Sequence, residues 1–357
     1  MEFTYKFSAV KGIQAKQEYY IAMVPLKYLG TLFRFDSDIP QPEFRSQRRI
    51  NEFRIPEIKS YILNNRNNYV FSALAASIDG DFKFLPIDGN DNIGILEVVM
   101  NAKFLINDGQ HRLAAINEAL LEDETLNDET ISIVFYKDEG LKKSQQMFTD
   151  LNKHAVKTSN SLSTLYDTRD KLAVITKEVI NNVEFFNLYT DKEKDNLGKN
   201  SSKLFTLNNI YKANHRILKT KNYKKTDEKF LITFWNEVSN NITEWQELLN
   251  KAITKKELRE DYIITLAVTL NAFGKLGSYF YENQNVDMAS VLTSLSKVNW
   301  SRNCKENWLG RTIGADGKVK NNEEAIFLTY IKIKECLNIP ITKEEKGKEK
   351  QIIKKGM

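Results

Sequence analysis

The chain has 357 residues, of which 41% are hydrophobic and 28% are charged. This length allows two domains that each bury a core, and the composition argues against wholesale disorder. The 52 lysine and arginine residues nearly balance the 47 acidic residues, so the net charge is only +5, which is compatible with a nucleic-acid partner but does not require one.

The first part of the chain alternates between strand and helix patterns. Residues 3–34 open with aromatic side chains two apart and continue with a β-rich run, which predicts two or three strands. A helical pattern covers residues 43–65. Further strands are predicted over residues 69–78, 93–99, 104–106 and 131–136. The polar turn before the second of these resembles a calcium loop, but Ile93 and Val99 replace the glycine and glutamate that such a loop needs, which excludes an EF-hand.

The main candidate functional residues lie in the segment FLINDGQHRLAAINEALL, residues 104–121. Asp108 and Gly109 predict a tight turn from a buried strand into a helix that begins at Gln110. The unpaired N–H groups and the dipole of such a helix start attract anions. Gly109 lets the backbone approach a ligand, Gln110 and His111 can donate or accept, and Arg112 suits phosphate oxygens. The turn therefore predicts a phosphate site, unless Asp108 only caps the helix and the basic side chains are ordinary surface residues.

Helical periodicity replaces strand alternation after about residue 166. An amphipathic helix is predicted over residues 142–152, and apolar stripes at helical spacing recur through the rest of the chain. We predict an α+β protein with three parts. These are a mixed-sheet domain over residues 1–165, a mainly α-helical domain over residues 166–342 and a basic flexible tail over residues 343–357.

Cysteine and histidine are too few for a metal or disulfide scaffold. Cys304 and Cys336 have no C-x-x-C partner, so free thiols are expected. The three histidines, His111, His154 and His215, match no zinc pattern, so no metal site is predicted. The chain begins without a secretory apolar run, and no stretch approaches the length of a membrane span, which predicts a cytoplasmic protein without membrane contact.

A basic stretch over residues 199–229 is the best local signal for nucleic acid. It holds nine lysine or arginine residues against two acids and is interleaved with aromatic residues, so it could follow a phosphate backbone. Solvated helix faces explain it about as well, and no recognition helix is evident. DNA contact is predicted at Lys199, Lys203, Lys212, Arg216, Lys219, Lys221, Lys224 and Lys225.

The string DGQHR at residues 108–112 resembles the signature of a set of proteins similar to ParB and sulfiredoxin in fold. The flanking sequence resembles one family of that set, the DndB proteins, over most of the chain. The matching segments are QRR at 47–49, RIPEI at 54–58, YVFSAL at 69–74, SIDG at 77–80, QMFTDLNK at 146–153, AVK at 155–157, SLS at 161–163, LYD at 165–167, SSKLFT at 201–206 and NWSR at 299–302.

The resemblance implies a ParB/sulfiredoxin-like first domain whose DGQHR turn holds nucleotide phosphates. Two elements would close over the nucleotide, one carrying Arg48 and Arg49 and the other carrying Asn152 and Lys153. Without the resemblance, these basic side chains read as solvated helix residues.

The chemistry of sulfiredoxin does not transfer to this chain, because Gln110 stands where sulfiredoxin has its cysteine. Asp108 is the only carboxylate in the turn and the one catalytic candidate. If a nucleoside triphosphate is hydrolysed, Mg²⁺ would have to neutralise most of its charge.

The resemblance to DndB implies a DNA-binding regulator of a phosphorothioate modification system, a transcriptional repressor that binds the promoter of its own gene cluster. The alternative is a nucleoside triphosphatase or nucleotide-dependent nuclease built on the ParB-like turn. A third reading is an assembly subunit that contacts the other sulfur-modification proteins. A homo-oligomer is expected in each case.

Overall fold

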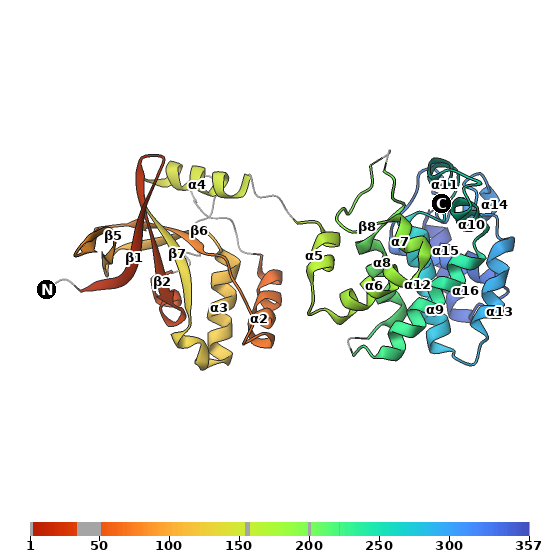
Figure 1. Cartoon of the computed structure of the whole chain (residues 1–357), viewed down its shortest axis with the longest axis horizontal. Helices are drawn as coiled ribbons and strands as arrows, with labels where there is room; N and C mark the ends of the chain where they lie inside the picture. Colours follow the sequence, from red (N-terminus) through yellow and green to blue (C-terminus); the bar gives the residue numbers. More distant parts are fainter. Residues whose placement is uncertain (1–2, 34–50, 154–157, 199–200, 221, 357) are drawn as a thin grey trace. The chain divides into compact units, whose positions relative to one another are not determined.

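The computed structural model describes residues 3–33, 51–153, 158–198, 201–220 and 222–356 (Figure 1). The chain forms two compact units, Met1–Val156 and Lys157–Met357. The first unit carries a seven-stranded sheet and the second is mostly helical. This confirms the α+β prediction, with the mixed sheet first and the helices second.

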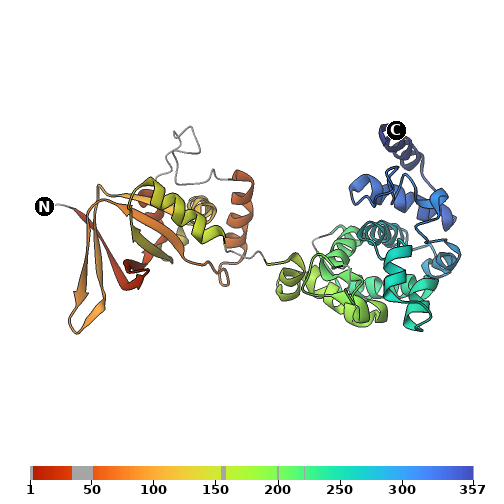
Figure 2. The ribbon, with the colours of Figure 1, turned by 90° about the horizontal axis from the view of Figure 1, so that it is seen from above.

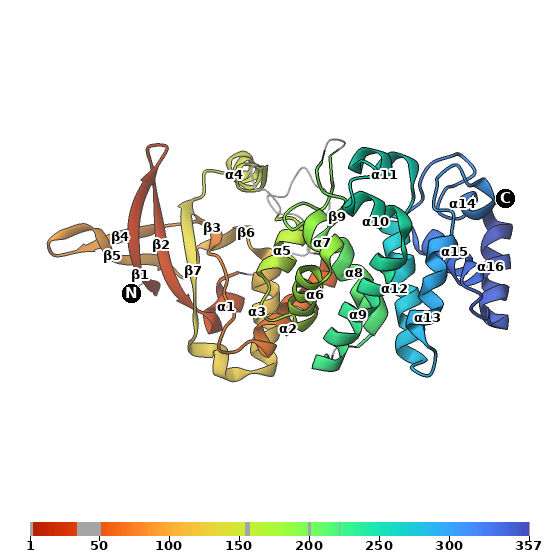
Figure 3. The ribbon, with the colours of Figure 1, turned by 45° about the vertical axis from the view of Figure 1, so that its right-hand side comes forward.

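The sheet of the first unit is mixed. Its order is β4-β5-β1-β2-β7-β3-β6, and every neighbouring pair is antiparallel except β3 and β7. Figures 2 and 3 show the β4–β5 hairpin extending beyond the other strands. The strands are β1 (Thr4–Gln14), β2 (Gln17–Pro25), β3 (Leu74–Asp79), β4 (Phe82–Ile87), β5 (Asn90–Val99), β6 (Lys103–Asp108) and β7 (Thr130–Lys137).

Helix α3 packs on this sheet and α4 lies beside the end of β6. Leu113, Ile116 and Ala119 of α3 are buried in one core with apolar side chains of the strands. Met147 of α4 contacts Asn107 of β6. The helices are α1 (Leu29–Leu32), α2 (Ile55–Asn64), α3 (Gln110–Glu122) and α4 (Leu141–Lys153), with 3-10 turns η1 (Leu26–Tyr28), η3 (Glu52–Arg54) and η4 (Glu124–Asp128).

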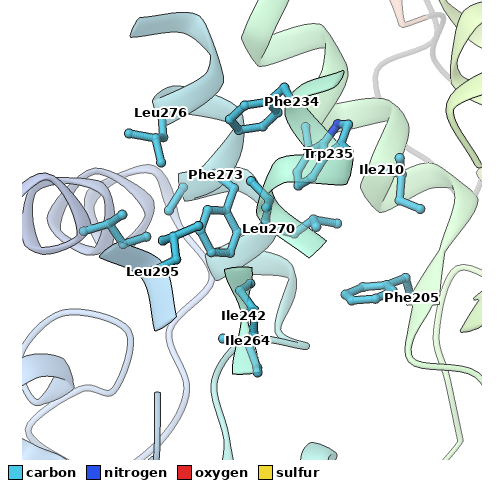
Figure 4. Close-up of a cluster of buried hydrophobic side chains, with 14 of the residues drawn as sticks. Phe205, Ile210, Phe234, Trp235, Ile242, Ile264, Leu270, Phe273, Leu276 and Leu295 are labelled. Carbon is cyan, nitrogen blue, oxygen red and sulfur yellow. The ribbon is translucent and has the colours of Figure 1, made fainter. Parts of the chain in front are cut away.

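The second unit is built around α12 (Ala267–Glu282), which packs on α8 (Leu207–Leu218) and α15 (Glu323–Cys336). Gly274 and Gly277 face α8, where an added Cβ would lie 2.8 Å from the Ala213 carbonyl oxygen and 2.8 Å from Ile217 Cγ1. The two glycines thus permit close helix packing. Figure 4 shows the aromatic and aliphatic core around this helix, and all four tryptophans of the chain are fully buried in the unit.

The elements of the second unit run in the following order. They are α5 (Asn160–Tyr166), α6 (Lys171–Asn182), α7 (Glu184–Tyr189), β8 (Thr190–Asp191), β9 (Phe205–Thr206), α8 (Leu207–Leu218), α9 (Lys225–Asn241), α10 (Thr243–Leu249), α11 (Lys255–Asp261), α12 (Ala267–Glu282), α13 (Met288–Leu292), η5 (Thr293–Lys297), α14 (Lys305–Trp308), α15 (Glu323–Cys336) and α16 (Lys343–Gly356).

The structure departs from the sequence expectation at both ends of the second unit. Helix α5 belongs to this unit, because Ser161 hydrogen-bonds to Asp195 and to the Asn208 amide. The expected flexible tail is instead the helix α16. Thr342 and Glu345 form reciprocal hydrogen bonds at its start, and Glu345 also pairs with buried Lys334, so the first turn is fixed to α15.

Two smaller expectations can also be compared with the structure. Cys304 and Cys336 are free thiols, and burial raises the pKa of the Cys336 thiol. Among the described residues, no helix is both long enough and apolar enough to cross a membrane.

Candidate functional site

The turn between β6 and α3 requires glycine. Gly109 has a φ of +100°, in the left-handed region that residues with a side chain rarely adopt. A Cβ built on Gly109 would collide with Cδ2 of Leu74, a fully buried residue of β3. The DGQHR segment is therefore held tightly against the neighbouring strand.

The start of α3 has no side-chain cap. Its N-cap residue is Gly109, and the first turn contains no acidic residue. The first intrahelical bond runs from the Leu113 amide to the Gly109 carbonyl, at 2.9 Å. The amides of Gln110, His111 and Arg112 precede that bond. This is the arrangement at which a helix can hold an anion.

Arg112 is engaged by the protein itself. Its Nη2 donates to Asp108 Oδ2 at 2.6 Å, and its Nη1 donates to the main-chain oxygens of Ser72 and Ala73 at 2.6 and 3.1 Å. In this conformation the guanidinium neutralises Asp108 and fixes the segment before β3 to the turn. It therefore positions the turn instead of offering both nitrogens of its fork to a ligand.

His111 connects the turn to the segment before α2. Its Nε2 accepts a hydrogen bond of 2.9 Å from the Asn51 amide. Asn51 begins the first described segment after Arg48 and Arg49. Those two arginines lie outside the described residues.

Two buried amide side chains flank Gly109. Asn107 is 1% exposed, and its Nδ2 donates to Ser77 Oγ at 2.7 Å and to Met147 Sδ at 3.1 Å. Within the described parts of the chain, Asn107 Oδ1 and Gln110 Nε2 are buried without a hydrogen-bond partner. Each such atom costs about 1–3 kcal/mol unless something binds it. Gln110 Nε2 is a donor, which fits a phosphate oxygen.

Asn107 and Ser77 were not among the site residues predicted from the sequence. Both occupy interior positions of apolar strands, where a polar side chain must be hydrogen-bonded to be tolerated. A polar residue within an otherwise apolar strand was the sequence feature that could have identified them.

Helix α4 carries the other element expected to close over a nucleotide. Lys153 is its last residue and is exposed. The side chain of Asn152 and all of His154 lie outside the described part of the chain. The structure thus brings together Asp108 through Arg112 and describes Lys153 at the end of α4, whereas Arg48, Arg49 and the side chain of Asn152 lie outside the described part of the chain.

The predicted DNA-contacting residues do not share one environment. Arg216 pairs with Glu323 and donates to Asn271 Oδ1 at 2.8 Å, and Lys219 pairs with Glu282 at 2.9 Å. Lys203 Nζ donates to the Leu188 carbonyl at 2.7 Å. Lys212, Lys219, Lys224 and Lys225 are exposed, whereas Lys199 and Lys221 lie outside the described residues.

The matching segments of the second unit serve mainly to hold it together. Burial acts to raise the pKa of the Asp195 carboxylate, but hydrogen bonds from Asn160 and Ser161 outweigh it and place that pKa below its usual value. Trp300 is fully buried, and Arg302 donates to the Tyr262 carbonyl at 3.1 Å.

One protein-family model matches residues of both units. The chain matches the family model described as DndB: DNA-sulfur modification-associated, over residues 7–340. No curated protein and no solved structure matches the chain. The matched range includes the DGQHR turn, both segments expected to close over a nucleotide and the buried segments of the helical unit.

Proposed function

Because the chain belongs to the DndB family of DNA-sulfur-modification-associated proteins, we propose that it binds DNA and represses the gene cluster of a phosphorothioate modification system. The family match over residues 7–340 carries this proposal. Other proteins of the modification system and a second copy of this chain are its proposed partners.

The proposed DNA surface lies on the second unit at Lys212, Lys224 and Lys225. All three side chains are exposed and lie on α8 or at the start of α9. Each lysine that neutralises a phosphate releases condensed counterions, so binding should weaken steeply as salt rises. Arg216 and Lys219 already pair with carboxylates and should contribute less.

A gel-shift titration at several salt concentrations tests the DNA proposal. The probes are the DNA upstream of the gene cluster and a scrambled duplex of equal length. We expect the upstream DNA to bind more tightly, and we expect the triple change of Lys212, Lys224 and Lys225 to Gln to reduce the salt slope by about two to three.

A matched control changes three exposed lysines elsewhere in the same unit, Lys297, Lys305 and Lys318, to Gln. It alters net charge equally and should leave the slope nearly unchanged. Equal affinity for both duplexes would refute specific binding, and equal slopes for the two triple variants would refute the proposed surface.

We further propose that the DGQHR turn binds a nucleoside triphosphate with Mg²⁺ and that this nucleotide controls the regulator. The uncapped start of α3 and the unpartnered donor Gln110 Nε2, among the described residues, support this. The direct test is calorimetric titration with ATP, GTP and CTP. Gln110→Met keeps the size of the side chain but removes the donor, so it should weaken nucleotide binding about tenfold or more without lowering stability.

Hydrolysis of the nucleotide is the second candidate function. It is favoured by Asp108, whose carboxylate lies at the turn and is 43% exposed. Phosphate release in the presence of Mg²⁺, compared between the unmodified protein and Asp108→Asn, tests it. Nucleotide binding without phosphate release would leave the turn as a regulatory site only.

A further inference from the structure

A second candidate site lies within the second unit, whereas the DGQHR turn belongs to the first. A hollow of about 830 Å³ is bordered by α8, α12, α15 and α16. Three aromatic side chains line it, Tyr279, Phe327 and Tyr330. A volume in this range is typical of a small-molecule pocket.

Basic side chains from all four helices line the hollow. They are His215, Arg216, Lys219, Lys275, Lys334 and Lys348, and the lining carboxylates are Glu282, Glu344 and Glu345.

Three of these cations are paired within the protein. Lys334 is 1% exposed and pairs with Glu345 at 2.8 Å. Lys219 pairs with Glu282, and Arg216 pairs with Glu323 of α15. These pairs fix the walls of the hollow, because they join the end of α8 to α12, α8 to α15 and α15 to α16.

Lys275 is different. It is partly buried on α12, and no carboxylate pairs with it among the described residues. Burial lowers the pKa of its ammonium group, and the nearby charges of Arg216, Lys348 and Lys219 lower it further, while Glu323 acts in the opposite direction. Lys275 is thus a cation held among cations.

Lys348 of α16 also lines the hollow, but its side chain is exposed. Its Nζ lies 4.8 Å from the centre of the Phe327 ring, a cation–π contact that leaves its charge without a carboxylate in the described structure. Two lysines from different helices therefore direct uncompensated charge toward one hollow. A bound anion would offset the cost of keeping the partly buried Lys275 charged.

We propose that this hollow binds the phosphate group of a small organic phosphate, with Lys275 as its central ligand. Five lysine and arginine side chains line the hollow against three carboxylates, and this excess of positive charge favours a multiply charged group such as phosphate over a single carboxylate. The aromatic wall offers apolar surface to the organic part. A duplex backbone is the less suitable source of the phosphate, because Lys275 is recessed whereas DNA contacts exposed cations.

Calorimetric titration of the full chain with inorganic pyrophosphate tests the site. The variant is Lys275→Met, and the control is Lys229→Met, an exposed lysine on α9. We expect Lys275→Met to weaken binding at least about tenfold and Lys229→Met to leave it unchanged. The melting temperature of free Lys275→Met should equal or exceed that of the unmodified protein, because a partly buried, unpaired charge has been removed.

Hydrogen exchange locates the ligand and separates its two possible sources. Pyrophosphate should slow exchange in peptides from α12 and α16. Equal binding by both variants, protection confined to the DGQHR turn, absence of pyrophosphate binding, or slowing by a short DNA duplex but not by pyrophosphate would each overturn the proposal. Because these peptides belong to the second unit, failure here leaves the nucleotide proposal for the turn untouched.

Discussion

The change Gly109→Ala should destabilise the first unit strongly. Alanine at a φ of +100° costs about 1 kcal/mol in backbone strain. Its Cβ would also collide with Leu74, which is fully buried and cannot turn toward solvent, and such overpacking costs about 1–3 kcal/mol. We therefore expect a loss of about 2–4 kcal/mol.

A matched glycine separates the collision from the backbone strain. Gly89, in the turn between β4 and β5, has a φ of +80°, and an added Cβ would meet nothing within 4 Å. Gly89→Ala should therefore cost only about 1 kcal/mol.

Hydrogen exchange of peptides covering β3 and β6 measures the stability of the first unit. Tryptophan fluorescence during urea unfolding reports the second unit, because residues 235, 245, 300 and 308 are the only tryptophans. The urea midpoint measured by tryptophan fluorescence should shift in neither glycine variant. If Gly109→Ala costs no more than Gly89→Ala, the close packing of the DGQHR turn against β3 is wrong.

Two further changes test the second unit. Asp195→Asn should lower its stability by about 1–2 kcal/mol near neutral pH, because the carboxylate accepts hydrogen bonds from Asn160. The pKa of Asp195 is lowered in the folded state, so the stabilisation by its carboxylate is fully present above the unfolded-state pKa and is lost as pH falls through the folded-state pKa. The difference in urea midpoint between Asp195→Asn and the unmodified protein should therefore be smaller at pH 3 than at pH 7. An equal difference at both pH values would contradict this. Asn214→Leu should cost about 2–4 kcal/mol by urea unfolding, because it leaves the buried Trp235 indole N–H and Thr176 hydroxyl without their partner, and a loss below about 1 kcal/mol would refute that role.

Periodicity in the sequence was a good guide to the helices and to most of the sheet, because burial on one face leaves a direct record in the residue pattern. It failed for β4, where Phe82–Ile87 contains a proline and is largely exposed. This strand lies at the edge of the sheet, where proline is tolerated and burial does not enforce alternation. The start of β3 was also placed too early, before Leu74.

The tail was misread because its stabilising contacts are distant in sequence. Residues 343–357 are dominated by lysine and glutamate, which alone suggests a solvated segment. Helix α16 is held by Glu345, which contacts Lys334 and Tyr330 of α15. The composition of this segment cannot reveal that its Glu345 carboxylate pairs with a lysine buried in the preceding helix.

The sequence located the DGQHR turn but not the roles within it. Its residue types suggested that Arg112 would hold a phosphate, yet the guanidinium binds Asp108 and the two main-chain carbonyls before β3. Residue type gives the charge of a side chain, whereas its partner depends on which strand lies alongside, and β3 is more than thirty residues earlier in the chain.

Separating these roles changes which substitutions are informative. Arg112→Ala would release Asp108 and the segment before β3, so lost nucleotide binding in that variant could reflect a distorted turn. Gln110→Met removes one buried donor that has no partner among the described residues and preserves the volume of the side chain. A ligand site at the turn predicts that this milder change weakens nucleotide binding about tenfold or more while the first unit keeps or gains stability. A purely structural turn predicts no effect on binding, so retained nucleotide affinity in Gln110→Met would count against the site.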